Sequence, residues 1–173
     1  MPHTLRPAVL ADVPALSAFA SAHFPDAAPP VVPREFVAAF VSENLDEASF
    51  TRYIETGAYS FTLAVNEADE IIAYFGIDHE APQPAEIPGK AAYLSKFYLS
   101  AKTRGTGLAR ELMDAVIAAA RADGKDGLHL GTHQLNHRAQ AFYEKMGFAK
   151  VGERTFQLTD TEVAHDYIYY LSI

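Results

Sequence analysis

The chain has 173 residues, of which 49% are hydrophobic and 21% are charged. This composition is ordinary for a globular protein and excludes intrinsic disorder, and the length fits one domain, which we expect to span residues 1–173. The formal net charge of -8 excludes a broad basic surface, so we expect no nucleic-acid partner.

The chain contains no cysteine, which removes disulfides, thiolate metal ligands and cysteine nucleophiles from consideration. We expect no metal. Residues 1–10 lack the basic stretch and apolar run of a signal peptide, and no segment approaches the ~20 apolar residues that span a bilayer. We therefore expect a cytoplasmic protein without a membrane partner.

The first third of the chain predicts one strand and two helical regions. A short strand over residues 5–8 precedes a helix whose expected N-cap is Asp12. A second helical region covers residues 33–56, with a break expected near 44–47. Between the two regions, the proline-rich residues 25–33 predict a loop.

The middle of the chain predicts three strands. Residues 59–66 and 71–78 are rich in β-branched and aromatic residues and flank a polar turn at 67–70, a pattern that indicates a hairpin. A second proline-rich loop at 82–88 precedes a strand over residues 91–99.

The last third alternates helices and strands. A helix over residues 107–123 is followed by a short buried strand over 128–132 and a helix over 136–146. Residues 148–156 and 166–171 predict a closing pair of strands. The chain as a whole therefore predicts a mixed α/β fold.

The most informative stretch is the glycine turn from Arg104 to Ala109, between a predicted strand and a helix. Glycines let the backbone direct several N–H groups to one point, and the helix N-terminus adds partial positive charge, which suits a phosphate. Arg104 and Arg110 can pair with phosphate oxygens as planar forks. A purely structural turn is the alternative. The residues do not match the P-loop or dinucleotide-binding patterns, so a different phosphate ligand is indicated.

The residues around this turn match a family pattern. A strand, the motif R-x-x-G-x-A (Arg104, Gly107 and Ala109), an amphipathic helix, a strand and the run N-x-x-A-x-x-F-Y-E-K-x-G-F over residues 136–148 follow in order. Together they resemble the two adjoining signature motifs of the GCN5-related N-acetyltransferases (GNAT). The resemblance covers residues 93–148, and the opening strand and helix are also similar to that family.

The resemblance implies both a fold and an activity. We expect a mixed, mostly antiparallel twisted sheet of about seven strands, with helices on both faces and a splay between the fourth and fifth strands. The implied enzyme uses acetyl-coenzyme A (acetyl-CoA) to acetylate a primary amine of a small molecule by direct attack. Two alternatives share the coenzyme motifs: an N-terminal peptide or protein acetyltransferase, and a non-catalytic acyl-CoA-binding regulatory domain. A homodimer is left open.

The resemblance also implies roles for individual residues. A bulge or splay at the end of the fourth strand would expose main-chain groups to the pantetheine arm, and the glycine turn would hold the pyrophosphate. The expected coenzyme-binding residues are Phe97, Tyr98, Leu99, Arg104, Gly105, Thr106, Gly107, Leu108, Ala109, Arg110 and Asn136. Tyr143 would act as general acid toward the departing sulfur. The structural alternatives are a helix N-cap for Asn136 and core packing for Tyr143.

The general base is left unassigned. Many members of the family carry a glutamate base on the fourth strand, where this chain has Tyr93, Ser95 and Lys96. His129 and His133 are the nearby candidates whose unperturbed pKa values lie near neutrality. For each histidine, a structural role is the alternative.

A looser resemblance concerns the acceptor. Residues 43–53 and 152–166 are similar to bacterial spermine and spermidine acetyltransferases, which suggests a polyamine. A polyamine would need carboxylates to pair with its ammonium groups. Carboxylates in the segments expected to line the acceptor are Glu43, Asp46, Glu47, Asp78 and Glu80. The alternative is that these are solvated surface charges.

Overall fold

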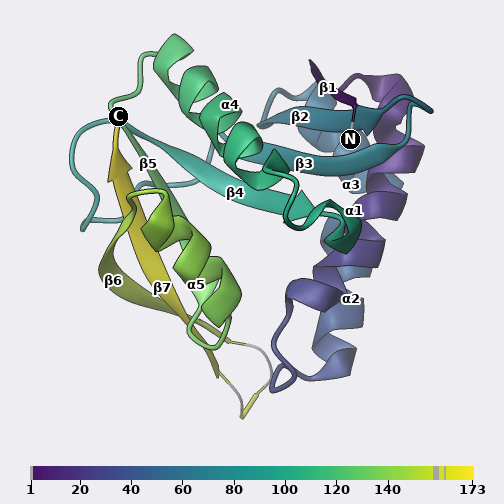
Figure 1. Cartoon of the computed structure of the whole chain (residues 1–173). Helices are drawn as coiled ribbons and strands as arrows, with labels where there is room; N and C mark the ends of the chain where they lie inside the picture. The colour runs from purple at the N-terminus through teal and green to yellow at the C-terminus, as the bar shows by residue number, and fades with distance from the viewer. Residues whose placement is uncertain (1, 158–159, 162) are drawn as a thin grey trace.

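The computed structural model of the chain describes residues 2–157, 160–161 and 163–173. In this part of the chain, five α-helices flank a seven-stranded sheet with the order β1-β2-β3-β4-β5-β7-β6 (Figure 1). The strands are β1 His3–Pro7, β2 Tyr59–Asn66, β3 Ile71–Asp78, β4 Ala91–Leu99, β5 Gly127–His133, β6 Ala149–Gln157 and β7 Val163–Ser172. The helices are α1 Val13–Ala27, α2 Arg34–Asn44, α3 Glu47–Glu55, α4 Leu108–Ala122 and α5 His137–Lys145.

The sheet is antiparallel except between β4 and β5, which run parallel. These two strands pair only from Ala91 to Tyr93 on β4, and beyond Tyr93 they diverge, as Figure 1 shows. The fold class expected from the sequence is therefore confirmed: a mixed, mostly antiparallel sheet, splayed between its fourth and fifth strands. The expected strands over 59–66, 71–78 and 91–99 have these bounds in the structure.

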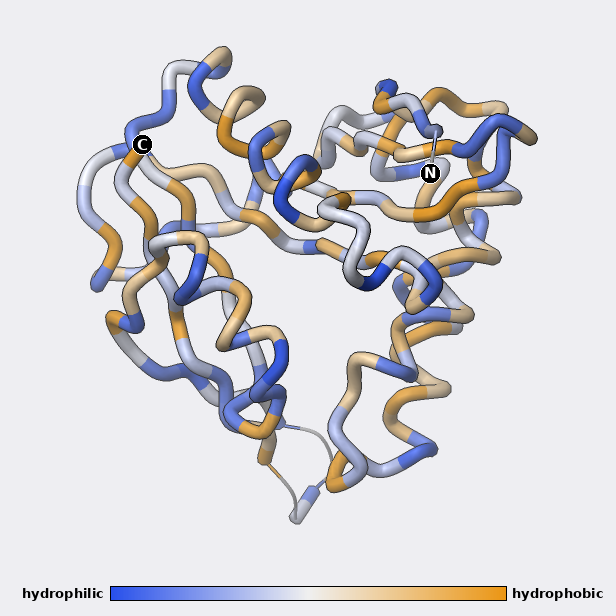
Figure 2. Tube along the Cα trace, in the orientation of Figure 1, coloured by the Kyte–Doolittle hydropathy of each residue, from blue (hydrophilic) through white to orange (hydrophobic). Residues whose placement is uncertain are grey.

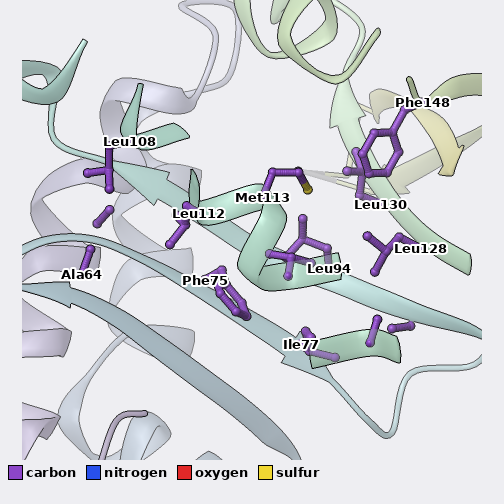
Figure 3. Close-up of a cluster of buried hydrophobic side chains, with 14 of the residues drawn as sticks. Ala64, Phe75, Ile77, Leu94, Leu108, Leu112, Met113, Leu128, Leu130 and Phe148 are labelled. Atoms are coloured by element: carbon purple, nitrogen blue, oxygen red, sulfur yellow. The ribbon is translucent and has the colours of Figure 1, made fainter. Parts of the chain in front are cut away.

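Helices cover both faces of the sheet. On one side, the α4 face, the core contains residues of α4 together with side chains of β3, β4 and β5, and α5 packs beside it. Figure 3 shows Leu112 and Met113 of α4 directed toward Phe75 and Leu94, and all four are buried. On the other side, the α1 face, side chains of α1 and α3 pack on β2 and β3.

Helix α4 anchors the α4 face through its amphipathic pattern. Leu108, Leu112 and Val116 recur at helical spacing and are buried, whereas Arg110 and Asp114 are exposed. Figure 2 shows this alternation as hydrophobic and hydrophilic stretches along the helix. Within the described residues, no helix combines the length and apolar character needed to cross a bilayer.

The first proline-rich segment differs from the expected loop at its start. Helix α1 continues through Pro25 to Ala27 before the chain leaves the helix. Proline in the last turn removes only its own N–H from the helix, and the Ala28 N–H still donates to Phe24 O at 3.2 Å. Phe24 also stacks on Phe40 of α2 with ring centroids 4.6 Å apart. Packing therefore outweighs the one lost hydrogen bond.

Two aspartates at helix starts behave differently. Asp46 caps α3 by accepting the Ser49 N–H at 2.9 Å, which explains the expected break in the second helical region. Asp12 is the N-cap residue of α1 as expected, but its side chain makes no capping hydrogen bond to that helix. Its carboxylate accepts a hydrogen bond from each Nη atom of Arg6, both at 2.8 Å, and a third from the Val9 N–H. The hydrogen bond from Arg6 lowers the pKa of Asp12.

The C-terminal pair of strands is present as β6 and β7, which are antiparallel neighbours. The looser polyamine-acetyltransferase resemblance over 152–166 includes residues 158–159 and 162, which lie outside the described residues. The pairing of β6 with β7 places Arg154 opposite Asp166.

Candidate active site

The glycine turn between β4 and α4 is fixed by threonine hydroxyls. Thr103 Oγ1 donates to Ser100 O at 2.7 Å, and Thr106 Oγ1 donates to Thr103 O at 2.6 Å. Gly105 and Gly107 have φ angles of 79° and 85°, in the left-handed region that strains other residues. The threonine hydroxyls therefore stabilise the turn through hydrogen bonds, and the glycines adopt the φ angles that it requires.

This turn presents open backbone amides. Within the described residues, the N–H groups of Gly105, Gly107, Ala109 and Arg110 donate to no protein acceptor. A Cβ added at Gly105 or Gly107 would meet no atom within 4 Å, so the space before the turn is open. Helix α4 begins at Leu108 and adds the positive end of its dipole. The turn therefore fits a diphosphate.

Two arginines border the turn. Arg104 and Arg110 are both exposed. Neither forms an ion pair with a carboxylate in the described part of the chain. Both guanidinium groups are therefore available to phosphate oxygens. The structure brings the predicted residues from Arg104 to Arg110 together in one turn.

The end of β4 directs backbone groups into the splay. Ser100 N–H donates to Ile72 O on β3 at 2.9 Å. Because backbone groups alternate in direction along an antiparallel strand, those of Phe97 and Leu99 point away from β3. They face the side from which β5 has diverged. These are the main-chain groups that the sequence resemblance assigns to the pantetheine arm.

A β-bulge on β4 decides which side chains face each side of the sheet. The pairing of β4 with β3 skips Ser95, between Leu94 and Lys96. Leu94 and Phe97 pack on the α4 face, whereas Lys96 and Tyr98 lie on the α1 face. In a regular strand Lys96 would share the face of Leu94. The bulge therefore transfers Lys96 to the opposite side of the sheet.

Tyr143 lies on α5 and packs against the end of β4. Its ring centroid is 6.4 Å from that of Phe97 and 5.7 Å from that of Phe148. Burial raises the pKa of the Tyr143 phenol, so it stays protonated at neutral pH. Its hydroxyl forms no hydrogen bond to a described residue. A protonated phenol with an unused donor beside the splay can serve as a general acid.

Asn136 takes the structural role that was its alternative. Its Oδ1 accepts the Ala139 N–H at 3.3 Å and caps α5, and its Nδ2 donates to Ala27 O at 3.5 Å. The cap is compatible with a coenzyme contact, because the amide nitrogen carries two hydrogens. Asn136 also lies about two helical turns from Tyr143, toward the same side of the helix.

Both histidine candidates for the base have structural roles. His129 is 3% exposed and stacks on Tyr93 with ring centroids 4.8 Å apart. Burial, aided by the charge of Arg154, lowers the pKa of His129 to about 4. His129 is therefore a weak base at neutral pH. His133 Nδ1 accepts the Leu135 N–H at 3.1 Å and shapes the turn before α5.

Sequence reasoning missed Arg154, which connects strands on both sides of the splay. From β6, its Nε and Nη2 donate to Asp166 Oδ2 on β7, each at 3.3 Å, and its Nη1 donates to Tyr93 Oη on β4 at 3.3 Å. Gly131 of β5 leaves room for the guanidinium, which a Cβ at that position would strike. No local sequence motif predicts this cluster, because its residues come from four different strands.

A second polar cluster was also missed. Tyr59 Oη and Ser95 Oγ are 2.8 Å apart, and Lys96 Nζ lies 5.5 Å from the centroid of the Tyr59 ring. The sequence analysis noted Lys96 only as one of the residues that stand where many family members carry a glutamate base. Its face could not be read without the bulge.

The carboxylates predicted to line a polyamine site fall into two groups: two accept backbone hydrogen bonds and three are simply exposed. Asp46 caps α3, as described above. Asp78 Oδ1 accepts two backbone N–H groups of the loop that follows β3. The carboxylates that are simply exposed are Glu43, Glu47 and Glu80. For these three, the solvated-surface alternative describes the structure.

A pocket lies near the start of β4, apart from the glycine turn. Its lining includes Asp78, Gln83, Tyr93, Lys125 and His129, and none of the predicted coenzyme-binding residues. Among residues 2–157, 160–161 and 163–173, no three or more His, Asp or Glu side chains are grouped so as to hold a metal ion.

Solved structures share this fold over the whole chain. The PaiA N-acetyltransferase from Thermoplasma acidophilum, in complex with coenzyme A, superposes with a TM-score of 0.78 at 17% identity, covering 100% of both chains. NAA60 of Arabidopsis thaliana, in complex with a bisubstrate analogue, gives a TM-score of 0.71 at 17% identity, covering 99% of both chains. At these identities the similarity concerns the fold.

Sequence comparison identifies the family. Residues 28–148 match the acetyltransferase (GNAT) family. An uncharacterized N-acetyltransferase of Mycobacterium tuberculosis is 38% identical over 149 residues, which cover 86% of this chain and 90% of the relative. A second uncharacterized N-acetyltransferase, from Lactobacillus delbrueckii subsp. lactis, is 26% identical over 127 residues, covering 73% and 72%. The chain therefore belongs to the acetyltransferase (GNAT) family and is an N-acetyltransferase.

Proposed function

We propose that residues 1–173 work as one domain that transfers the acetyl group of acetyl-CoA to a primary amine of a small molecule. The observation that carries this proposal is the convergence of three parts at the splay. They are the open amides within residues 105–110 described above, the backbone groups of Phe97 and Leu99, and the ring of Tyr143 against Phe97. The coenzyme A bound to PaiA, which has the same fold, supports the choice of coenzyme.

Each part of the site has a task in holding the coenzyme. The amides of the glycine turn bind the diphosphate, and Arg104 and Arg110 pair with its oxygens. The backbone groups of Phe97 and Leu99 bind the pantetheine arm, which takes the place that a neighbouring strand would have beside β4. Asn136 contributes its amide nitrogen. When bound, acetyl-CoA supplies a thioester that an amine can attack.

Tyr143 completes the chemistry as general acid. As the amine attacks, negative charge passes to the sulfur, and a phenol within hydrogen-bond reach donates its proton. Burial favours this role because it keeps the phenol protonated. The absence of cysteine from the chain agrees with direct attack and no covalent enzyme intermediate.

The acceptor approaches from the α1 face, because the coenzyme-binding parts occupy the α4 face and the splay. Tyr93, Lys96 and Arg154 lie on that side. A polyamine acceptor stays a prediction. Of its five proposed carboxylates, Asp78 is the one whose charge acts on the pKa of Lys96.

An acceptor screen tests the proposal. The purified chain is incubated with acetyl-CoA and polyamines, amino-acid amides, aminoglycosides or peptides with free N-termini. Coenzyme A release is followed with a thiol reagent, which the cysteine-free chain does not consume, and acetylated acceptor is identified by mass spectrometry. We expect turnover with a small amine. Turnover with peptides alone would favour the N-terminal acetyltransferase, and coenzyme binding without turnover would favour the regulatory domain.

A further inference from the structure

Three polar side chains meet at the bulge of β4 on the α1 face. The Tyr59 side chain crosses β3 from β2, and its hydroxyl lies 2.8 Å from Ser95 Oγ. Gly76 of β3 makes this crossing possible, because a Cβ there would lie 2.7 Å from the Phe61 ring and 3.3 Å from that of Tyr59. Lys96 extends over the Tyr59 ring, with Nζ 5.5 Å from its centroid.

Most of the Lys96 residue is removed from water. Lys96 is 7% exposed. Its Nζ forms no hydrogen bond or ion pair with a described residue and has the Tyr59 ring as its partner. Such an amine retains its donors and, when neutral, its lone pair for a molecule that enters from the α1 face. Its backbone neighbour, Phe97, is the residue proposed to hold the pantetheine arm.

The other titratable groups on this face are less suited to accept a proton. His129 stacks on Tyr93 and is a weak base. His133 Nδ1 already accepts a backbone N–H. Asp166 accepts two hydrogen bonds from Arg154. Among the described residues at the bulge, Lys96 is the remaining group with an uncommitted nitrogen.

We propose that Lys96 is the general base of the acetyl transfer and that Tyr59 and Ser95 position its side chain at the bulge. This role rests on the proposed function. The acceptor amine, in its neutral form, forms a bond to the acetyl carbon, and the carbon–sulfur bond breaks. Neutral Lys96 Nζ takes the proton released by the acceptor nitrogen, while Tyr143 gives its proton to the sulfur. Lys96 then returns its proton to solvent, and Tyr143 regains one.

The surroundings of Lys96 match this role. Burial lowers the pKa of Lys96 to about 8, although the charge of Asp78 acts in the opposite direction. A useful neutral fraction is therefore present near neutral pH, and Asp78 stabilises the ammonium after proton transfer. The titratable and charged groups around Lys96 and its ring partner are Tyr59 of β2, Tyr74 and Asp78 of β3, Tyr93 and Tyr98 of β4, and Tyr53 and Arg52 of α3.

Substitution of Lys96 tests the role directly. Lys96→Met removes the base, and Lys96→Arg keeps a charge over the tyrosine ring but cannot release its proton. We expect both variants to lose at least ~100-fold in kcat, with coenzyme A affinity unchanged. Lys150→Met is the matched control, because Lys150 also lies over a tyrosine ring, Tyr167, but is exposed. It should keep full activity. An active Lys96→Arg variant would overturn the proposal.

The lack of native cysteine allows a sharper test. The Lys96→Cys variant is unfolded, alkylated with 2-bromoethylamine and refolded. Its side chain is then a lysine analogue in which a sulfur replaces one methylene group and the pKa of the amine is lower. We expect this treatment to restore activity and to move the acidic limb of the kcat profile to lower pH. A limb that stays in place would belong to the acceptor amine and would remove Lys96 from the role of base.

One measurement is independent of turnover. In wild-type protein with ¹³C-labelled lysine, the Lys96 Cε signal should titrate with a midpoint near 8. A midpoint above ~10, the range of an ordinary lysine, would overturn the base role even if no acceptor had been found. Absence of acetyl transfer by wild-type protein across the amine panel would instead count against the proposed function.

Discussion

The two sides of β4 are built in different ways. On the α4 face and at the splay, the groups that we propose to bind the coenzyme are mostly backbone atoms of two short segments, residues 97–99 and 104–110. On the α1 face, the polar groups are side chains from β2, β4, β6 and β7 that meet only in the folded chain. A site made of contiguous backbone tolerates changes of side chain except where the backbone requires glycine, as at Gly105 and Gly107. A site assembled from distant side chains can change its acceptor by single substitutions.

The largest effect should come from a side chain placed in the glycine turn. Gly107→Val forces a β-branched residue into φ 85° and places methyl groups before the open amides, so coenzyme A binding should be abolished in calorimetry. Gly124→Val is the matched control, because Gly124 has φ 75° in open space at the other end of α4. It should lose similar stability and keep binding. Equal binding by both variants would contradict a coenzyme site at the turn.

Loss of the phenol at Tyr143 should separate chemistry from packing. Tyr143→Phe keeps the ring contacts with Phe97 and Phe148 and deletes the donor, so kcat should fall at least ~100-fold with coenzyme affinity unchanged. Tyr169→Phe is the control, because its ring lies 6.2 Å from that of Tyr143 and its hydroxyl donates to Glu144. A Tyr143→Phe variant retaining more than ~30% of kcat, measured where chemistry limits turnover, would remove Tyr143 from the mechanism.

Acid should destabilise the α1 face through His129. Its pKa falls from 6.5 to about 4 in the folded state, so between these values the unfolded chain binds more protons and stability falls as the pH falls. The expected contribution is about 3 kcal/mol. Denaturant unfolding at several pH values should show this slope in wild type and lose it in His129→Gln. The same slope in both proteins would contradict a depressed pKa.

The smallest effect concerns the two roles of Asn136. Asn136→Ala removes the cap of α5 and should cost about 1 kcal/mol of stability. Asn136→Ser retains a capping oxygen and should restore most of that stability. If the amide nitrogen binds the coenzyme, as we propose, coenzyme affinity should fall in both variants. Wild-type affinity in Asn136→Ser would leave Asn136 with its cap alone.

The groups of the proposed coenzyme site could be identified in the sequence because they lie in short local stretches. Threonines and glycines fix the turn at residues 103–107 over a few positions, and Asn136 and Tyr143 share one short helix. β-Branched and aromatic content indicated the hairpin strands, and hydrophobic periodicity indicated α4. At Pro25 the local signal for a loop competed with packing of the helix. The end of α1 predicted from the sequence was therefore wrong, because the helix continues to Ala27.

The proposed acceptor side depends on tertiary structure. Alternation along a strand predicts that Lys96 shares the face of Leu94, and only the extra residue at Ser95 reverses this. The reach of Arg154 to Tyr93 likewise depends on the register of β6 with β7 and on the space above Gly131. Bulges and strand registers arise from pairing between distant segments. By itself, the sequence determined the elements, the glycine turn and the family pattern, while only the folded sheet decided which side chains lie on the α1 face, where we propose that the acceptor binds.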